Sequence, residues 1–203
     1  MKQYILAAIT MAALAGSATA GLIWSENWND VTTGAGPTLD AEWSYNGTAT
    51  AYAGTSGPDE SVAVWGRKTS TLDRFTDVTS FVDATNNKLQ IKAAVQATGL
   101  ESAEGDTGWI KYTKDSGSNW STLATYTDNH ADWINESFDL NVSTWTAGEL
   151  AGFGIRFEQV GSQFNDNLRT DDISISSVPE PATIGMVSLA GAALLFIRRR
   201  IIK

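Results

Sequence analysis

The chain has 203 residues, contains no cysteine and carries a formal net charge of −9 at pH 7. Without cysteine, neither a disulfide nor a thiol nucleophile is available. The acidic balance opposes contact with phosphate backbones, which argues against nucleic acid as a partner.

The first 20 residues have the parts of a secretory signal peptide. Lys2 supplies a positive charge, residues 4–14 are mostly apolar, and Ala18-Thr19-Ala20 fits the small-residue cleavage site. The apolar stretch is too short to cross a bilayer as a helix. We therefore expect export, with signal peptidase cutting after Ala20 so that Gly21 begins the mature chain.

Residues 21–177 form the predicted folded domain, which is large enough to bury a core without disulfides. Between residues 21 and 178, nine basic side chains oppose 22 acidic ones, a net charge of −13. Such a surface favours solubility and suits hard cations such as Ca²⁺.

Short segments of alternating polarity recur along this domain, without a convincing helical period. Each predicts a half-buried strand: residues 61–65, 88–96, 133–140, 150–158 and 171–177. We expect the following side chains to point inward, with Glu136 an exception within its strand: Leu89, Ile91, Ala93, Val95, Ile134, Phe138, Leu140, Ala151, Phe153, Ile155, Phe157, Ile173 and Ile175. Many strands with turn signals between them predict an all-β, antiparallel β-sandwich.

The order of these elements opens at residues 22–28 and closes with Asp171-Asp172-Ile173-Ser174-Ile175. In this it resembles the jelly-roll sandwiches of extracellular carbohydrate-binding, MAM-like and concanavalin-like modules. The resemblance implies a jelly roll and leaves the ligand open.

The jelly-roll resemblance also implies one structural Ca²⁺, because acids near the first and last strands often hold it in those modules. Glu26 and Asp30 lie in or just after the first strand, and Asp171 and Asp172 precede the last. The alternative is that all four are ordinary solvated acids. Asp106, Asp128 and Asp166 are lesser candidates in loops.

Residues 113–120 fit the Asp-box pattern, with predicted strands at 108–114 and 120–126 on either side. Asp115 is expected to accept hydrogen bonds from the turn, Gly117 to take a positive φ, and Trp120 to pack back over the hairpin. The pattern occurs once, which favours a structural turn.

All eight tryptophans lie in the mature domain. Flat aromatic faces bind sugars by stacking, so exposed rings are candidates for a glycan site. Trp133 and Trp145 stand in polar surroundings and are the candidates for glycan binding; the alternative is that most of the eight tryptophans fill the core.

No catalytic motif stands out. His130 is the single histidine, and no Ser-containing elbow exists to partner it. The tightest acidic group, Glu101, Glu104 and Asp106, lacks the spacing that would align acids on one strand face, and it indicates a solvated loop. We therefore expect no catalytic residues and no enzyme activity.

The C-terminal tail, residues 178–203, has three parts. Val178-Pro179-Glu180-Pro181 breaks regular structure, residues 182–197 carry no charge, and Arg198, Arg199 and Arg200 follow. The uncharged stretch predicts a short transmembrane helix with its basic end in the cytoplasm.

These three parts, in this order, resemble the PEP-CTERM sorting signal of bacteria; the alternative is a plain membrane anchor. The resemblance implies recognition by an exosortase, a brief inner-membrane intermediate, and release to the cell surface or the exopolysaccharide matrix. The leading interpretation is a non-catalytic glycan-binding or adhesion module of that matrix. A polysaccharide hydrolase or lyase on the same fold is the alternative, and a purely structural matrix protein is a third.

Overall fold

The computed structural model describes residues 20–179, apart from 32, 36–37, 48–51, 55–56, 59–62, 66–67 and 85. Within these residues, no helix combines the length and the apolar character needed to cross a bilayer. The predicted transmembrane helix at 182–197, its basic end, residues 180–181 of the predicted sorting motif and nearly all of the predicted signal peptide lie outside the described residues.

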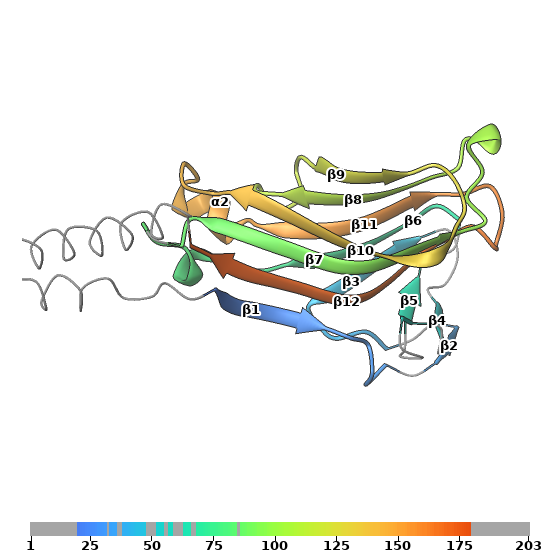
Figure 1. The fold of residues 1–203 in the computed structure, drawn as a ribbon, viewed down its shortest axis with the longest axis horizontal. Helices are drawn as coiled ribbons and strands as arrows, with labels where there is room; N and C mark the ends of the chain where they lie inside the picture. Colours follow the sequence, from blue (N-terminus) through green and yellow to red (C-terminus); the bar gives the residue numbers. More distant parts are fainter. Residues whose placement is uncertain are drawn as a thin grey trace, which may run out of the picture.

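Two antiparallel sheets pack face to face, which confirms the predicted all-β sandwich (Figure 1). The larger sheet has the order β10-β7-β12-β5-β4-β2, with β1 also paired to β12, and the smaller has the order β3-β6-β11-β8-β9. The larger sheet contains β1 (Gly21–Glu26), β2 (Gly34–Ala35), β4 (Tyr52–Gly54), β5 (Ala63–Trp65), β7 (Lys88–Thr98), β10 (His130–Asn141) and β12 (Asn167–Val178). The smaller contains β3 (Trp43–Gly47), β6 (Ser70–Phe75), β8 (Thr107–Thr113), β9 (Ser121–Tyr126) and β11 (Gly154–Val160).

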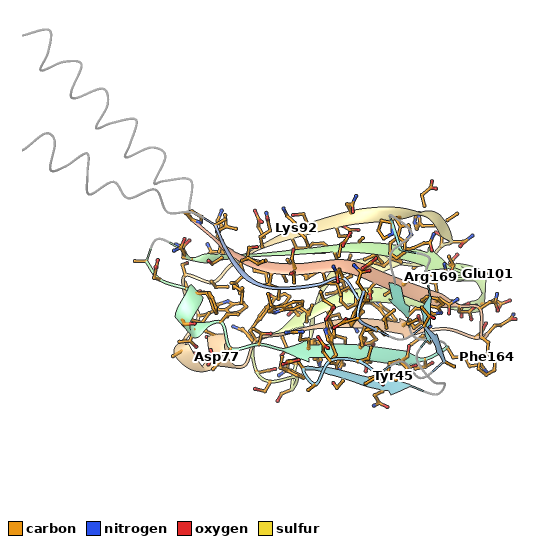
Figure 2. The ribbon with its side chains drawn as sticks, turned by 90° about the horizontal axis from the view of Figure 1, so that it is seen from below. Tyr45, Asp77, Lys92, Glu101, Phe164 and Arg169 are labelled. Atoms are coloured by element: carbon orange, nitrogen blue, oxygen red, sulfur yellow. The ribbon has the colours of Figure 1, made fainter. Side chains whose placement is uncertain are left out.

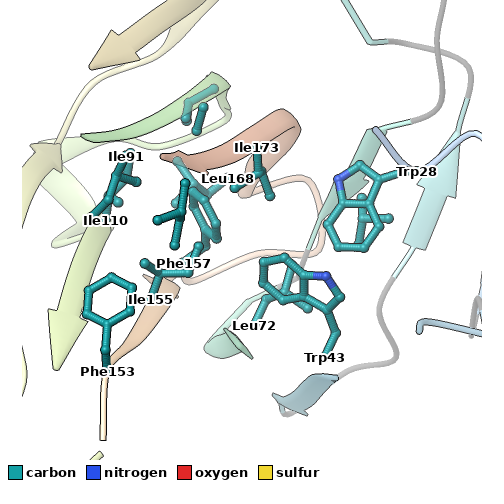
Figure 3. Packing of buried hydrophobic residues seen from close by; sticks show 14 of the residues in the cluster. Trp28, Trp43, Leu72, Ile91, Ile110, Phe153, Ile155, Phe157, Leu168 and Ile173 are labelled. Atoms are coloured by element: carbon teal, nitrogen blue, oxygen red, sulfur yellow. The ribbon is translucent and has the colours of Figure 1, made fainter. Parts of the chain in front are cut away.

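Alternation along the strands places all but one of the predicted inward side chains on the side that faces the core. Ile91 of β7 lies opposite Phe138 of β10 and Ile175 of β12, so three strands present apolar groups at one level. Trp28 and Trp43 add two large buried rings to this core, 5.0 Å apart between centroids (Figure 3). Both rings are enclosed as core residues, as the alternative interpretation of the tryptophans predicted.

Glu136, the expected exception on β10, has a hydrogen-bond partner within the fold. The hydroxyl of the buried Tyr126 donates to its carboxylate at 2.8 Å. Burial, together with this carboxylate, raises the pKa of Tyr126. A carboxylate on the inward side of β10 is therefore tolerated because a phenol faces it.

One predicted inward position is wrong. Ala151 is exposed, because the strand expected from residue 150 begins only at Gly154. Residues Ala147–Ala151 instead form the short helix α2, which starts in a capping box between Thr146 and Glu149. Reciprocal hydrogen bonds of this kind favour a helical turn over an extended chain. Two 3₁₀ turns, η1 (Thr79–Phe81) and η2 (Ser102–Glu104), are the other short helices of the described chain.

Candidate functional site

The outer face of the smaller sheet carries a row of paired charges. Ile155 and Phe157 of β11 point into the core, so Arg156 and Glu158 between them point outward. The strand register sets Arg156 beside Asp73 of β6 on one side and Lys111 of β8 on the other. We call Asp73, Arg156, Lys111 and Glu158 the charged ladder.

Short contacts hold the charged ladder together. The Nε and Nη2 atoms of Arg156 each donate to a carboxylate oxygen of Asp73 at 2.7 Å. Lys111 Nζ lies 2.9 Å from Glu158 Oε2, and Arg156 Nη1 lies 3.6 Å from the same oxygen. The Asp73 carboxylate raises the pKa of the Arg156 guanidinium. Two cations and two anions thus balance on this face, with donors and acceptors held at fixed spacing.

Two partly exposed tryptophans flank the charged ladder. Trp109 lies directly across from Glu158, and the Lys111 ammonium sits 4.6 Å from the centroid of its ring. Trp120 lies under the Arg156 guanidinium, 4.1 Å away, and 6.0 Å from the exposed ring of Phe75. Each ring therefore has a cation over it and stays partly exposed beside the polar centre.

The Asp-box turn fixes the position of Trp120. Asp115 Oδ1 accepts from the Thr113 hydroxyl at 2.7 Å and from the Asn119 main-chain N–H at 2.8 Å. Hydrogen bonds from Thr113 and Asn119 lower the pKa of Asp115 to about 2. Gly117 has a φ of 87°, a conformation that favours glycine. The hydrogen bonds, the glycine and the packed ring agree with a structural role for this turn.

A shallow open groove of about 310 Å³ continues this face toward one end of the sheet. Its walls come from β3, β6 and β11, and polar side chains predominate. The lining residues are Asn46, Gly47, Thr69, Ser70, Thr71, Arg156, Glu158, Gln159 and Val160. Arg156 and Glu158 belong to both the groove and the charged ladder, so the two features form one continuous surface.

The two tryptophans proposed from the sequence stand elsewhere. Trp145 stacks on Tyr112, with centroids 6.0 Å apart and planes inclined by 11°, and it also contacts Phe153 of the core. Trp133 lies near the start of β10, and eight residues separate it from the end of that strand, roughly 26 Å along an extended chain. The structure therefore does not bring Trp133 and Trp145 together.

Of the acids proposed for calcium, Glu26 ends β1 opposite Ile173 of β12, and Asp30 follows β1 by four residues. Asp171 and Asp172 do not precede the last strand as predicted, because β12 already begins at Asn167. The Glu26 carboxylate accepts from the Trp28 N–H at 3.0 Å and from Trp43 Nε1 at 3.3 Å, and burial raises its pKa. Asp171 is fully buried, whereas Asp30 and Asp172 are exposed. Nowhere in the described part of the chain do three acidic or histidine side chains gather as metal ligands. The calcium site stays a prediction.

The lesser candidates for calcium, Asp106, Asp128 and Asp166, form hydrogen bonds within and between neighbouring loops. Asp106 and Asp166 are each only 2% exposed, and both accept from main-chain N–H groups of the loop between β11 and β12. Asp128 accepts from the Ser102 hydroxyl at 3.2 Å. The expectation that residues 101–106 form a solvated loop is thus wrong for Asp106, because the neighbouring loop folds over it.

The residues considered for catalysis lie around η2 and at the start of β10, outside the groove and the charged ladder. His130 is exposed at the start of β10, opposite Ala97. Glu101 and Glu104 are exposed around η2, and a hydrogen bond from Ser162 lowers the pKa of Glu104. Neither acid belongs to the groove or to the charged ladder.

The surface formed by the charged ladder, Trp109 and Trp120 was not predicted from the sequence. The alternation that sets Ile155 and Phe157 inward also sets Arg156 and Glu158 outward, and the same rule applied to β8 would have placed Trp109 and Lys111 beside each other on one face. The sequence lacked the register that sets Asp73 next to Arg156, 83 residues away. No local pattern carries that pairing.

No protein-family model matches the chain, and no curated protein matches it. Among solved structures, the C-terminal family 22 carbohydrate-binding module of Clostridium thermocellum Xyn10B aligns with a TM-score of 0.51 at 12% identity, covering 79% of this chain and 97% of that one. A family 22 xylan-binding domain of Paenibacillus barcinonensis Xyn10C aligns with the same score and identity over 81% and 99%.

A third solved structure of similar fold is the K1 cleaved adhesin domain of Lys-gingipain from Porphyromonas gingivalis, with a TM-score of 0.51 at 12% identity over 79% of this chain and 99% of that one. A longer Clostridium thermocellum fragment that joins a family 22 module to a GH10 module is covered over only 29% of its length. The structural neighbours include carbohydrate-binding jelly-roll domains, and the likeness establishes the fold.

Proposed function

We propose that this chain is a non-catalytic glycan-binding or adhesion module that is exported and held at the bacterial cell surface or in exopolysaccharide. The binding site in this proposal is the outer face of β6, β11 and β8, with Trp109 and Trp120 as stacking surfaces. One observation carries it: two partly exposed indoles flank a polar centre made of fixed, paired charges.

The chemistry of this face suits a sugar chain. Sugars present C–H groups on their faces, which stack on aromatic rings, and hydroxyl groups at their edges, which both donate and accept hydrogen bonds. The charged ladder offers both kinds of partner side by side. The groove of about 310 Å³ extends the surface beyond one sugar unit.

The solved structures of similar fold suggest the first ligand to try. The Paenibacillus domain is a xylan-binding domain, and the Porphyromonas domain is an adhesin domain. Xylan is therefore the leading probe, and other neutral polysaccharides follow.

Calorimetric titration of residues 21–178 with soluble xylan, mixed-linkage glucan, mannan and alginate tests the proposal. We expect saturable binding to at least one neutral polysaccharide, and its loss when Trp109 and Trp120 are both replaced by alanine. A wild-type domain that binds none of them would favour the purely structural alternative. Binding that survives the double replacement would place the site elsewhere.

The hydrolase or lyase alternative requires acids set across a scissile bond. On the outer face of the smaller sheet, Asp73 and Glu158 are both engaged by Arg156 or Lys111. We expect no release of reducing ends and no unsaturated products when the domain is incubated with a polysaccharide that it binds. Steady product formation would support the enzyme instead.

We further propose that signal peptidase and an exosortase process the chain, with an inner-membrane intermediate. The support comes from the signal-peptide pattern and from the Pro179-Glu180-Pro181 motif, the uncharged residues 182–197 and the arginine cluster of the tail. Replacing the three motif residues by alanine should trap the protein in the inner-membrane fraction of a host that carries an exosortase. Unchanged fractionation would reject this sorting route.

A further inference from the structure

The first strand of the sandwich begins beside the end of the last strand. Gly21 of β1 lies opposite Ser177 of β12, and the Ser177 hydroxyl donates to the Gly21 carbonyl at 3.4 Å. Val178, the last residue of β12, is still paired with Lys88 of β7. Figure 1 shows the start of β1 and the end of β12 at the same end of the long axis, near α2. We call this end of the sandwich the foot.

The tail begins directly at the foot. Four peptide steps separate Val178, which is held in the sheet, from Ala182, where the uncharged stretch starts. Fully extended, four steps reach at most about 14 Å. Pro179 and Pro181 also fix their own φ angles, which stiffens the connection. If residues 182–197 insert into a bilayer, the folded domain therefore has no long spacer between it and the lipid.

The foot carries apolar side chains that face solvent. Leu22 of β1 is 61% exposed, and Phe81 at the end of η1 is 38% exposed. The η1 turn packs beside α2, and Figure 2 shows Asp77, just before η1, at this same end. Glu101 and Phe164 lie at the opposite end of the long axis. Phe164 is 59% exposed, so the two ends differ in their distance from the tail rather than in apolar exposure.

We propose that the foot rests on the lipid surface while the tail is inserted, with Leu22 and Phe81 contacting the interfacial region. This inference relies on the proposed membrane insertion of the tail. The strands then stand steeply on the membrane, and the loops around Glu101 and Phe164 point away from it. The outer face of β6, β11 and β8 opens sideways, so a polysaccharide chain can reach it without displacing lipid.

Site-directed fluorescence tests this orientation, because a chain without cysteine accepts single labels cleanly. Four variants of the chain from Gly21 to Lys203 are labelled with a polarity-sensitive dye: Leu22→Cys, Phe81→Cys, Phe164→Cys and Ser188→Cys. Each is reconstituted into phosphatidylcholine vesicles with and without headgroup-proximal spin-labelled lipid. Ser188 reports insertion of the tail, and Phe164 is the matched apolar control at the far end. Circular dichroism checks that each variant keeps its strands.

We expect the lipid quencher to reduce emission at positions 22, 81 and 188 and to leave position 164 unchanged. Quenching at 188 without quenching at 22 and 81 would overturn the proposed contact between the foot and the lipid, and would leave tail insertion intact. Equal or stronger quenching at 164 would overturn the proposed orientation. Absence of quenching at 188 would overturn both proposals, while glycan binding by the sandwich would still be measured separately.

Discussion

The guanidinium of Arg156 lies 4.1 Å from the centroid of the Trp120 ring and donates two hydrogen bonds to Asp73. The same cation thus joins the turn after β8 to the centre of the smaller sheet. Because the Asp-box hydrogen bonds already fix the turn, Trp120 is held in place before any ligand arrives. A ring held in this way loses little conformational freedom on binding, which favours affinity.

Removing either flanking ring should weaken glycan binding. Trp109→Ala and Trp120→Ala are each expected to reduce the association constant roughly tenfold, because each removes one stacking surface from the face. Calorimetric titration with the best-bound polysaccharide measures the change. An unaltered constant in both variants would show that the sugar does not use this face.

The two tryptophans suggested by the sequence provide the comparison. Trp145→Ala should destabilise the domain, because its ring stacks on Tyr112 and contacts Phe153, and should leave affinity unchanged under conditions where the domain is folded. Trp133→Ala should also leave affinity unchanged, since Trp133 belongs to the other sheet. Loss of binding in either variant, with folding intact, would favour the sequence-based candidates over Trp109 and Trp120.

Local patterns predicted β7, β10, β11 and β12 with most of their inward residues, because alternation in one strand reports its own burial, but they did not predict β3 or β6. They misplaced Ala151, because the capping box between Thr146 and Glu149 starts a short helix where alternation predicted an extended strand. Local patterns could not predict the charged ladder. Asp73 and Arg156 meet only after β6 and β11 pair, and the pairing depends on the packing of the whole sandwich. The sequence identified Trp120 as part of a turn. Its position beside the charged ladder follows from its contact with Arg156, which is distant in sequence.

The Asp73–Arg156 pair should contribute to stability as well as to the site. Both side chains are partly buried and joined by two hydrogen bonds, so Asp73→Ala leaves a cation with its main partner removed. We expect a loss of about 2 kcal/mol in the free energy of unfolding, measured by urea denaturation. Asp139→Ala, an exposed acid on the other sheet, should change it by less than about 0.5 kcal/mol. Similar values for the two variants would contradict this role.

Acid should destabilise the domain in a defined window. Hydrogen bonds from Thr113 and Asn119 lower the pKa of Asp115 from 3.8 to about 2, and Lys114 together with Thr146 lowers that of Glu149 from 4.5 to about 2. A depressed carboxyl pKa means that the unfolded chain binds more protons, so this stabilisation is present above the ordinary pKa and is lost as the pH falls toward 2.

Thermal melts between pH 5 and pH 2 measure this loss. We expect the midpoint to fall with pH, and to fall less steeply in Asp115→Asn and Glu149→Gln than in the wild type. Asp132→Asn, an exposed acid outside the turn and the capping box, serves as the control and should keep the wild-type slope. Parallel curves for all four proteins would rule out these two carboxyls as the source.

The calcium prediction is tested by ligand-linked stability. A cation that binds only the folded state at 100 times its dissociation constant adds about 2.7 kcal/mol, which corresponds to a rise of roughly 5–10 °C in the midpoint of a domain of this size. Glu26→Ala removes a proposed ligand, but it also leaves the Trp28 N–H and Trp43 Nε1 without their acceptor.

The decisive quantity is therefore the shift in melting midpoint between Ca²⁺ and EDTA within each protein. We expect a rise in the wild type that is absent in Glu26→Ala and is not reproduced by Mg²⁺, which prefers a smaller, octahedral site. A wild-type midpoint that is the same in Ca²⁺ and EDTA would show that β1 and β12 meet without a metal, and that Glu26 serves the indole and the main chain alone.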